Sequence, residues 1–282
     1  MDDYLDSVKT EEEAISRAKD VGDIPSSGDF YLTKWMSNSP EVLRAFQANL
    51  GEGQEVHLTE DETEKIMGVC WKHFTDTLTF RTITTEDTIY TRRGLLKKIA
   101  TIFDPLGFAA PLTIRAKIKL KLLNTRGTGW DEKIPSVEEE WWKKWFERVP
   151  SLSRLRIPRC LFENEDDILD IELYTFGDAS EEAFAAVVYL RIIYRDEQPK
   201  IKFIMAKTKL APKKTISVAR LELQAALLGA RLGNYVSKAF TRNITQRYFW
   251  TDSSCVRNWI RSPPALYKPS QNRGNTDADR LK

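Results

Sequence analysis

Residues 174–191, YTFGDASEEAFAAVVYLR, decide the fold of the C-terminal half of this chain. Tyr174, Thr175 and Phe176 favour a strand, and the β-branched and aromatic run 184–190 favours a second one. The intervening GDAS has turn chemistry, so the stretch predicts a hairpin. Asp178 stands where the first strand ends, and taken alone it is explained most simply as a turn former.

The pattern on both sides of this hairpin predicts an α/β chain with an α+β N-terminal part. Upstream, two amphipathic helices are separated by Asp104-Pro105-Leu106-Gly107, and a tryptophan-rich helix, SVEEEWWKKWFERV, follows. We interpret its tryptophans as core residues rather than as base-stacking platforms. From the hairpin onward the sequence predicts a mixed sheet with helices, in the order strand 171–177, strand 183–194, strand 200–208, helix 217–239, strand 247–251 and helix 254–261.

Two further carboxylates occupy comparable places in this order of elements. Glu222 lies in RLELQAALLGARL, among small apolar residues of a predicted helix, where an unpaired carboxylate is costly to bury. Asp252 follows the apolar strand in RYFWTDSS. Each has a simple structural explanation: Glu222 pairs with Arg220 or Lys238, and Asp252 caps the next helix.

Together, the three carboxylates predict a metal site at one edge of the sheet. Strand ends and a packed helix bring side chains to a common edge, and carboxylate oxygens are the ligands that hard divalent cations prefer. Two such cations hold the attacking and leaving oxygens of a phosphodiester. The joint pattern therefore favours phosphodiester chemistry, although each residue alone does not.

Charge is unevenly distributed along the chain. Residues 91–126 carry nine Lys or Arg and one acid, and residues 199–221 carry seven Lys or Arg and no acid. Such stretches are typical either of phosphate contacts or of solvated faces. For the second stretch we predict contact with a nucleic-acid backbone through Lys200, Lys202, Lys207, Lys209, Lys213 and Lys214.

The composition also excludes several functions. Three cysteines without metal-binding spacing favour a reducing compartment, and two histidines leave little for zinc sites or Ser-His-Asp triads. No apolar run reaches the length of a membrane span. We therefore expect a cytoplasmic protein, with the nucleus as an alternative, and no membrane partner.

Residues 171–262 resemble a ribonuclease H domain, particularly that of BEL/Pao retroelements, in the motifs FGDAS, RLELQAALLGARL and YFWTDSS. The resemblance implies that Asp178, Glu222 and Asp252 are catalytic ligands of two Mg²⁺ (or Mn²⁺) ions. The family has a fourth carboxylate in a later Asn-Pro-Ala-Asp segment, which NTDADR, with Asp277 and Asp279, does not resemble. We therefore expect an incomplete carboxylate set and an activity impaired by truncation.

The first residues, MDDYLDS, resemble the end of the Tyr-Met-Asp-Asp motif of reverse transcriptases. This resemblance implies that Asp2 and Asp3 are a remnant of a polymerase metal site. LTKWMSNSPEVL, MGVCWKHFTDTLTF and TRRGLLKKIATIFDPLGFAAPLTIRAKIKL resemble the later palm, the primer-grip hairpin and the thumb-like segment of BEL/Pao polyproteins. Because the other palm Asp and the fingers are absent, polymerase activity is not expected.

The resemblance implies a fragment of a BEL/Pao-type LTR retrotransposon polyprotein, a region also labelled Pao retrotransposon peptidase. The expected division has four parts. Residues 1–150 form a distal reverse transcriptase region with a palm remnant, a primer-grip hairpin and a thumb or connection. Residues 151–170 form a linker, residues 171–262 a truncated ribonuclease H-like domain and residues 263–282 an irregular tail.

The function implied by the resemblance is hydrolysis of RNA in RNA–DNA hybrids by a chain whose intact parent also copies RNA into DNA. Three alternatives remain open. One is an inactive nucleic-acid-binding remnant, and another is a pseudogene product without activity. An aspartic peptidase is disfavoured because GDAS and TDSS lack the glycine expected after Asp-Thr or Asp-Ser.

Overall fold

The computed structural model describes most of the chain and divides it into two compact units. The first unit combines residues 1–82 with 150–160, and the second combines 83–149 with 161–282. These two compact units do not test the predicted division into functional domains, which stays a prediction. The residues that the structure describes are 4–30, 32, 35–49, 63–66, 69–81, 88–162 and 165–263.

The first unit contains two helices and a small antiparallel sheet. Thr10 caps the first helix by accepting a hydrogen bond from the Glu13 N–H. In the sheet, Asp76 adopts a positive φ of 46° and accepts hydrogen bonds from the indole of Trp71 and the guanidinium of Arg159. The elements are α1 (Glu11–Ser26), α2 (Pro40–Asn49), β1 (Thr63–Ile66), β2 (Val69–Lys72), β3 (Thr77–Thr79) and β4 (Ile157–Pro158), with sheet order β1-β2-β3-β4. A 3₁₀ turn, η1 (Val149–Arg154), precedes β4.

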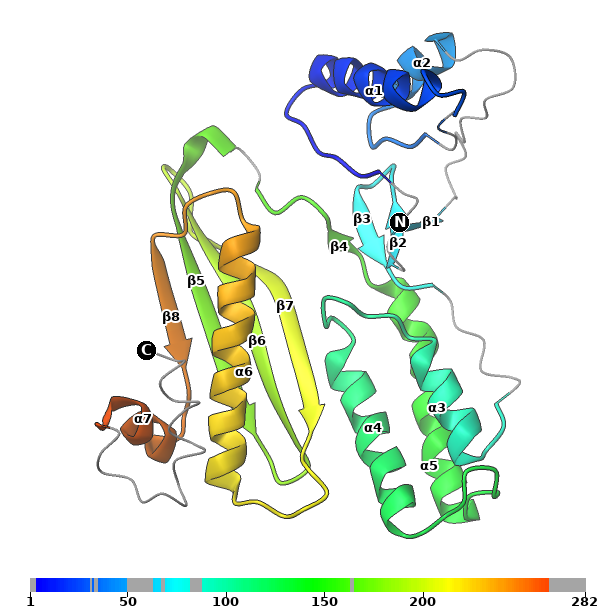
Figure 1. Ribbon diagram of the computed structural model, residues 1–282, viewed down its shortest axis with the longest axis vertical. Helices are drawn as coiled ribbons and strands as arrows, with labels where there is room; N and C mark the ends of the chain where they lie inside the picture. Colours follow the sequence, from blue (N-terminus) through cyan, green and yellow to red (C-terminus); the bar gives the residue numbers. More distant parts are fainter. Residues whose placement is uncertain are drawn as a thin grey trace. The chain divides into compact units, whose positions relative to one another are not determined.

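A four-stranded mixed sheet forms the centre of the second unit (Figure 1). Its strands are β5 (Ile168–Ala179), β6 (Ala183–Tyr194), β7 (Lys200–Leu210) and β8 (Gln246–Trp250), in the order β7-β6-β5-β8. β5, β6 and β7 are antiparallel neighbours, whereas β8 runs parallel to β5. A 3₁₀ turn, η2 (Glu165–Asp167), leads into β5, and α7 (Ser254–Arg261) follows β8. The predicted fold class and order of elements are confirmed.

One long helix, α6 (Val218–Ala239), covers one face of this sheet and closes its core (Figure 1). Buried and less buried residues alternate strictly along β6, as expected for a strand with one face against a helix. The core joins strand residues Leu173, Val188, Leu190 and Ile192 to the α6 residues Leu221, Leu228 and Leu232. Gly233 permits the close approach, because a Cβ there would lie 2.9 Å from the Thr175 hydroxyl.

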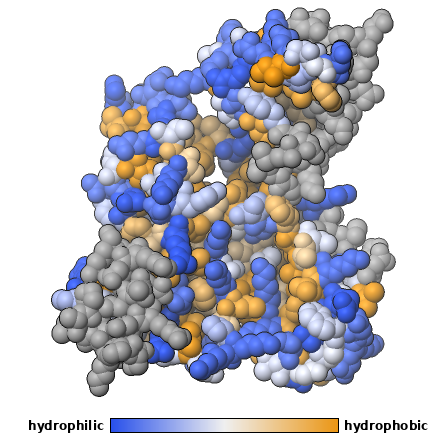
Figure 2. All heavy atoms as spheres, in the orientation of Figure 1, coloured by the Kyte–Doolittle hydropathy of each residue, from blue (hydrophilic) through white to orange (hydrophobic). Residues whose placement is uncertain are grey.

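Three further helices belong to the second unit. They are α3 (Arg92–Ala100), α4 (Ala110–Thr125) and α5 (Ser136–Phe146). Thr91 caps α3 by accepting from the Gly94 N–H, and Leu95, Leu123 and Trp142 are fully buried. Trp142 and Trp145 are core residues as predicted, whereas Trp141 keeps part of its surface exposed. On the face in Figure 2, hydrophilic and hydrophobic residues are interspersed over these elements.

The turn between α3 and α4 attaches these helices to the free edge of β7. The Leu106 carbonyl accepts a 2.8 Å hydrogen bond from the Ala206 N–H, and the rings of Phe108 and Phe203 lie 4.5 Å apart. Gly107 has a φ of 87°, and a Cβ there would lie 2.2 Å from the Ala206 carbonyl oxygen. Only glycine satisfies both the positive φ and this close contact. The turn therefore fixes the helices against the sheet through backbone contacts.

Asp104 begins this turn and gives stability a pH dependence. Burial raises the pKa of its carboxyl above the ordinary value, although the N–H groups of Ala109 and Gly107 donate to it. A group whose pKa is raised on folding binds more protons folded than unfolded, so stability falls as pH rises from about 4 through the raised value. For Asp104→Asn we expect a lower free energy of unfolding at every pH, because one hydrogen-bond acceptor is lost. We also expect this free energy to fall less than in the parent protein over the same pH range. Urea unfolding midpoints at a series of pH values test this, and parallel profiles for the two proteins would contradict it.

Within the described part of the chain, no helix combines the length and apolar character needed to cross a membrane.

Candidate functional site

Asp178 lies at the end of β5, one residue before the strand stops. Its side chain is exposed, and its Oδ1 accepts a 2.7 Å hydrogen bond from the Ala179 N–H. The hairpin itself is closed by Ser180, whose backbone N–H donates to the Ala183 carbonyl at 2.8 Å. Because Ser180 makes the turn, the turn-former explanation accounts poorly for a carboxylate at position 178.

Glu222 lies on the first turns of α6, at the same end of the sheet. A Cβ at Gly177 would lie 3.0 Å from the Ala225 carbonyl, whereas one at Gly229 would meet Thr175 at 3.1 Å. α6 therefore runs antiparallel to β5, and Glu222, one turn before Ala225, lies near the strand end that carries Asp178. Among the residues that the structure describes, Glu222 forms no ion pair, so neither Arg220 nor Lys238 neutralises it.

Asp252 follows β8 at a position matching that of Asp178. In the parallel ladder Phe176 is the partner of Trp250, so each Asp comes two residues after a paired position. Asp252 is exposed, and α7 is capped instead by Ser253, whose hydroxyl accepts from the Val256 N–H at 3.2 Å. The alternative explanation of Asp252 as the cap of this helix therefore does not hold.

The backbone brings all three carboxylates to one end of the sheet, but from two sides. Side chains alternate along β5, so Asp178 leaves the face opposite to Gly177, and hence opposite to α6. Glu222 approaches from the α6 side. Within the described ranges, no three His, Cys, Asp or Glu side chains are arranged to hold a metal ion. The donors have the chemistry that Mg²⁺ prefers, but the side chains as placed do not form a coordination group.

The predicted lysines lie along β7 and the turn after it. Lys207 and Lys209 are exposed and, through their partners Ala186 and Phe184, share the sheet face that α6 covers. They are at the end of β7 beside the start of β6, and so near Asp178. Lys200 lies about 30 Å away at the other end of the strand, where it pairs with Glu197 at 2.8 Å. Lys213 and Lys214, in the following turn, are exposed.

Aromatic side chains line the sheet face opposite to α6, and the sequence analysis did not single them out. Tyr174 stacks on Tyr248 with ring centroids 4.8 Å apart, and Phe176 lies parallel to Trp250 at 6.3 Å. All five residues of β8 are exposed. One feature of the sequence could have revealed this surface. Tyr174, Phe176 and Asp178 are two residues apart along β5, so their side chains share one side of the strand.

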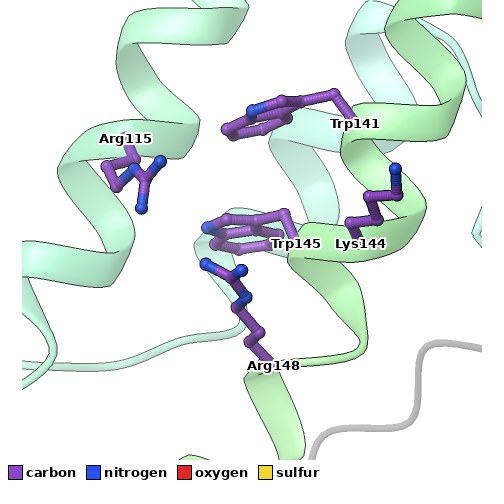
Figure 3. Close-up of a pocket in the computed structure, with 5 residues that line it drawn as sticks. All are labelled: Arg115, Trp141, Lys144, Trp145 and Arg148. Carbon is purple, nitrogen blue, oxygen red and sulfur yellow. The ribbon is translucent and has the colours of Figure 1, made fainter.

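A small cavity between α4 and α5 was also missed, because the tryptophans that line it were interpreted as core residues. It measures about 120 Å³ and is lined by Arg115, Trp141, Lys144, Trp145 and Arg148 (Figure 3). The indole N–H of Trp145 donates to the Leu112 carbonyl at 3.1 Å, which holds α5 against α4. No acidic side chain lines this cavity.

Several predicted residues lie outside the described part of the chain. They are Asp2 and Asp3, assigned to the polymerase motif, and Asp277 and Asp279 in the tail.

Comparison with known proteins gives a family and several similar solved structures. Two foamy viral structures are similar at low levels: a protease-reverse transcriptase dRH in complex with double-stranded DNA (TM-score 0.42, 15% identity, 78% of this chain and 36% of that chain) and a protease-reverse transcriptase in complex with double-stranded DNA (TM-score 0.34, 17% identity, 74% and 42%). This chain therefore spans less than half of either one. A comparison with curated proteins finds no match.

The family model described as "Pao retrotransposon-like RNaseH-like domain" matches residues 91–253. The match begins at the cap of α3 and ends at the cap of α7, so it includes the helices α3–α5, the mixed sheet and all three candidate carboxylates. Because it extends over more than half of the sequence, the chain belongs to the Pao retrotransposon-like RNaseH-like domain family.

Proposed function

We propose that this chain hydrolyses the RNA strand of RNA–DNA hybrids, with Asp178, Glu222 and Asp252 as ligands of divalent cations. The observation that carries the proposal is the convergence of three carboxylates at one end of the mixed sheet, set by the Phe176–Trp250 register and the Gly177–Ala225 contact. Membership of the RNaseH-like family supports it.

The absence of competing partners supports the same assignment. A carboxylate without a partner inside the fold remains available to bind a cation. Across the described residues, the only hydrogen bond formed by these three carboxylates is the one Asp178 accepts from its neighbour Ala179. Bound Mg²⁺ or Mn²⁺ ions supply activation of a water and neutralisation of the leaving oxygen. The three carboxylates would hold such ions at the end of the sheet where β5 and β8 end and α6 begins.

The lysines supply the complementary charge for the substrate. Lys207 and Lys209 are exposed near this rim, and Lys213 and Lys214 follow in the next turn. Ammonium groups there hold phosphates of the duplex in register without reading sequence. Lys200 has a different role, because it is paired with Glu197 and lies over the Tyr194 ring.

The test is cleavage of short RNA–DNA hybrids by the full chain, with either the RNA or the DNA strand labelled. We expect cleavage of the RNA strand only, requiring Mg²⁺ and abolished by a chelator. A double-stranded RNA of the same sequence serves as the matched substrate control and should remain intact. Cleavage of both strands, or cleavage that persists with chelator, contradicts the proposal.

A second candidate is a nucleic-acid-binding module without turnover. It is favoured by the observation that, in the described residues, no three acidic or other ligand side chains form a metal-binding group. It predicts hybrid binding that weakens steeply with salt, because phosphate contacts release counterions. Binding of that kind with no Mg²⁺-dependent cleavage selects this candidate over the first.

A further inference from the structure

The cavity between α4 and α5 combines two indole rings with three cations. Trp141 and Trp145 lie one helical turn apart on α5 and project toward α4, and Arg115 projects from α4 toward the space beside them (Figure 3). The Arg148 guanidinium lies next to the Trp145 ring, whereas Lys144 points away from the indoles (Figure 3) and pairs with Glu140 at 2.7 Å. The surface of the cavity is therefore mostly apolar, and the guanidinium groups of Arg115 and Arg148 lie beside it.

Arg115 is the one cation lining this cavity that has no partner among the residues that the structure describes. Its side chain is exposed, and among the described residues it forms neither a hydrogen bond nor an ion pair. Two other cations of α4 have partners: Lys119 contacts Glu138, and Lys121 donates to the Ala211 carbonyl at 2.8 Å. An unmatched guanidinium next to exposed aromatic surface is a binding arrangement for a planar group that carries an anion.

The size of the cavity restricts what it can hold. About 120 Å³ is well below the roughly 300–1,000 Å³ of a pocket for a whole small-molecule ligand. The volume suits one ring or one phosphate, as presented by a single unit of a polymer. Trp145 is nearly buried and its N–H is already bonded to the Leu112 carbonyl. The surface available for stacking is therefore the part of the Trp141 ring that the Lys119 ammonium, 5.3 Å from the ring centroid, leaves exposed.

We propose that this cavity binds one nucleotide of a nucleic-acid strand, with the phosphate at Arg115 and Arg148 and the base or sugar against Trp141. The site is separate from the three carboxylates and lies in the helical part of the family region. Its role is to hold the nucleic acid while hydrolysis takes place elsewhere. The inference extends the proposed function but does not require turnover, because binding is measured with chelator present.

The first experiment compares Arg115→Gln with Lys117→Gln in the full chain. Both remove one exposed positive charge from α4, but residues two apart on a helix point to different sides. Fluorescence anisotropy with a fluorescein-labelled RNA–DNA hybrid should give a Kd about fivefold weaker for Arg115→Gln, and a salt dependence reduced by about one phosphate contact. Lys117→Gln should remain within about twofold of the parent. Equal effects of the two substitutions would overturn the proposal, because they would show a general charge effect.

The second experiment locates the contact directly. An RNA–DNA hybrid carrying iodouridine is irradiated with the protein, and the cross-linked peptide is identified by mass spectrometry. We expect cross-links at Trp141, and an about tenfold weaker Kd for Trp141→Leu, which removes a stacking surface but keeps apolar packing. Cross-links confined to other segments would overturn the proposal. The binding and cross-linking results can hold even if the chain cleaves no RNA. Failure of this inference is therefore distinguishable from failure of the proposed hydrolysis.

Discussion

Asp178→Asn is expected to lower Mg²⁺-dependent cleavage of the RNA strand by about 100-fold or more. Under the proposed function, the substitution removes a charged oxygen ligand but keeps the size of the side chain. Because a divalent cation contributes several kcal/mol of charge stabilisation to phosphodiester hydrolysis, loss of one anionic ligand weakens both its binding and its position. Initial rates on an RNA-labelled hybrid over a range of Mg²⁺ concentrations measure the effect.

The fold should not change in this variant. Asp178 is exposed, and Asn retains the oxygen that accepts from the Ala179 N–H. The control is Glu181→Gln, which removes one negative charge from the exposed hairpin three residues away. We expect that protein to cleave within about twofold of the parent, because an exposed charge that binds nothing contributes little.

Two outcomes would reject the metal-ligand assignment of Asp178. Equal cleavage by the parent and Asp178→Asn would show that the carboxylate holds no essential ion. Equal losses in Asp178→Asn and Glu181→Gln would show that the rate follows total charge at this end of the sheet. Glu222→Gln and Asp252→Asn, assayed in parallel, should each show a loss like that of Asp178→Asn.

Gly107→Ala is expected to destabilise the second unit by about 3 kcal/mol, the sum of two costs. The residue has a φ of 87°, and a non-glycine residue in that region is strained by about 1–2 kcal/mol. The added Cβ would also lie 2.2 Å from the Ala206 carbonyl oxygen and 2.8 Å from its carbon. Because both neighbours are backbone atoms of β7, relief requires the turn or the strand to move, at about 1–3 kcal/mol. Urea unfolding followed by circular dichroism measures the loss.

Gly127 provides a matched control for this substitution. It has a similar φ of 81°, but nothing lies within 4 Å of a Cβ built there. Gly127→Ala should therefore cost only the backbone strain, about 1 kcal/mol. If the two substitutions destabilise equally, the close contact between the turn and β7 contributes nothing. If Gly107→Ala is the more costly, the difference measures that contact.

Local pattern was sufficient to predict most elements of the second unit. The alternating residues of β6 and the apolar spacing of α6 predicted the ends of the hairpin strand and of the helix to within a few residues. Each pattern has the period of the element that it forms, which is two residues in a strand and one turn in a helix. The break at residues 104–107 between α3 and α4 was likewise predicted, from proline and glycine. Trp141 shows the limit of this reasoning. Helical spacing does not distinguish it from its buried neighbour Trp142, and only the position of α4 leaves it part-exposed beside Arg115.

The sequence by itself determined which elements form, in which order, and that carboxylates lie at the ends of two strands and in the first turns of one helix. These features depend on short-range periodicity and turn chemistry, which neighbouring residues specify. Tertiary structure alone decided that Asp178 and Glu222 approach the sheet rim from opposite sides, that Gly107 lies against Ala206, and that Arg115 faces Trp141. Those relations join residues distant in the chain, and they arise from how helices pack on a sheet, which no local pattern encodes.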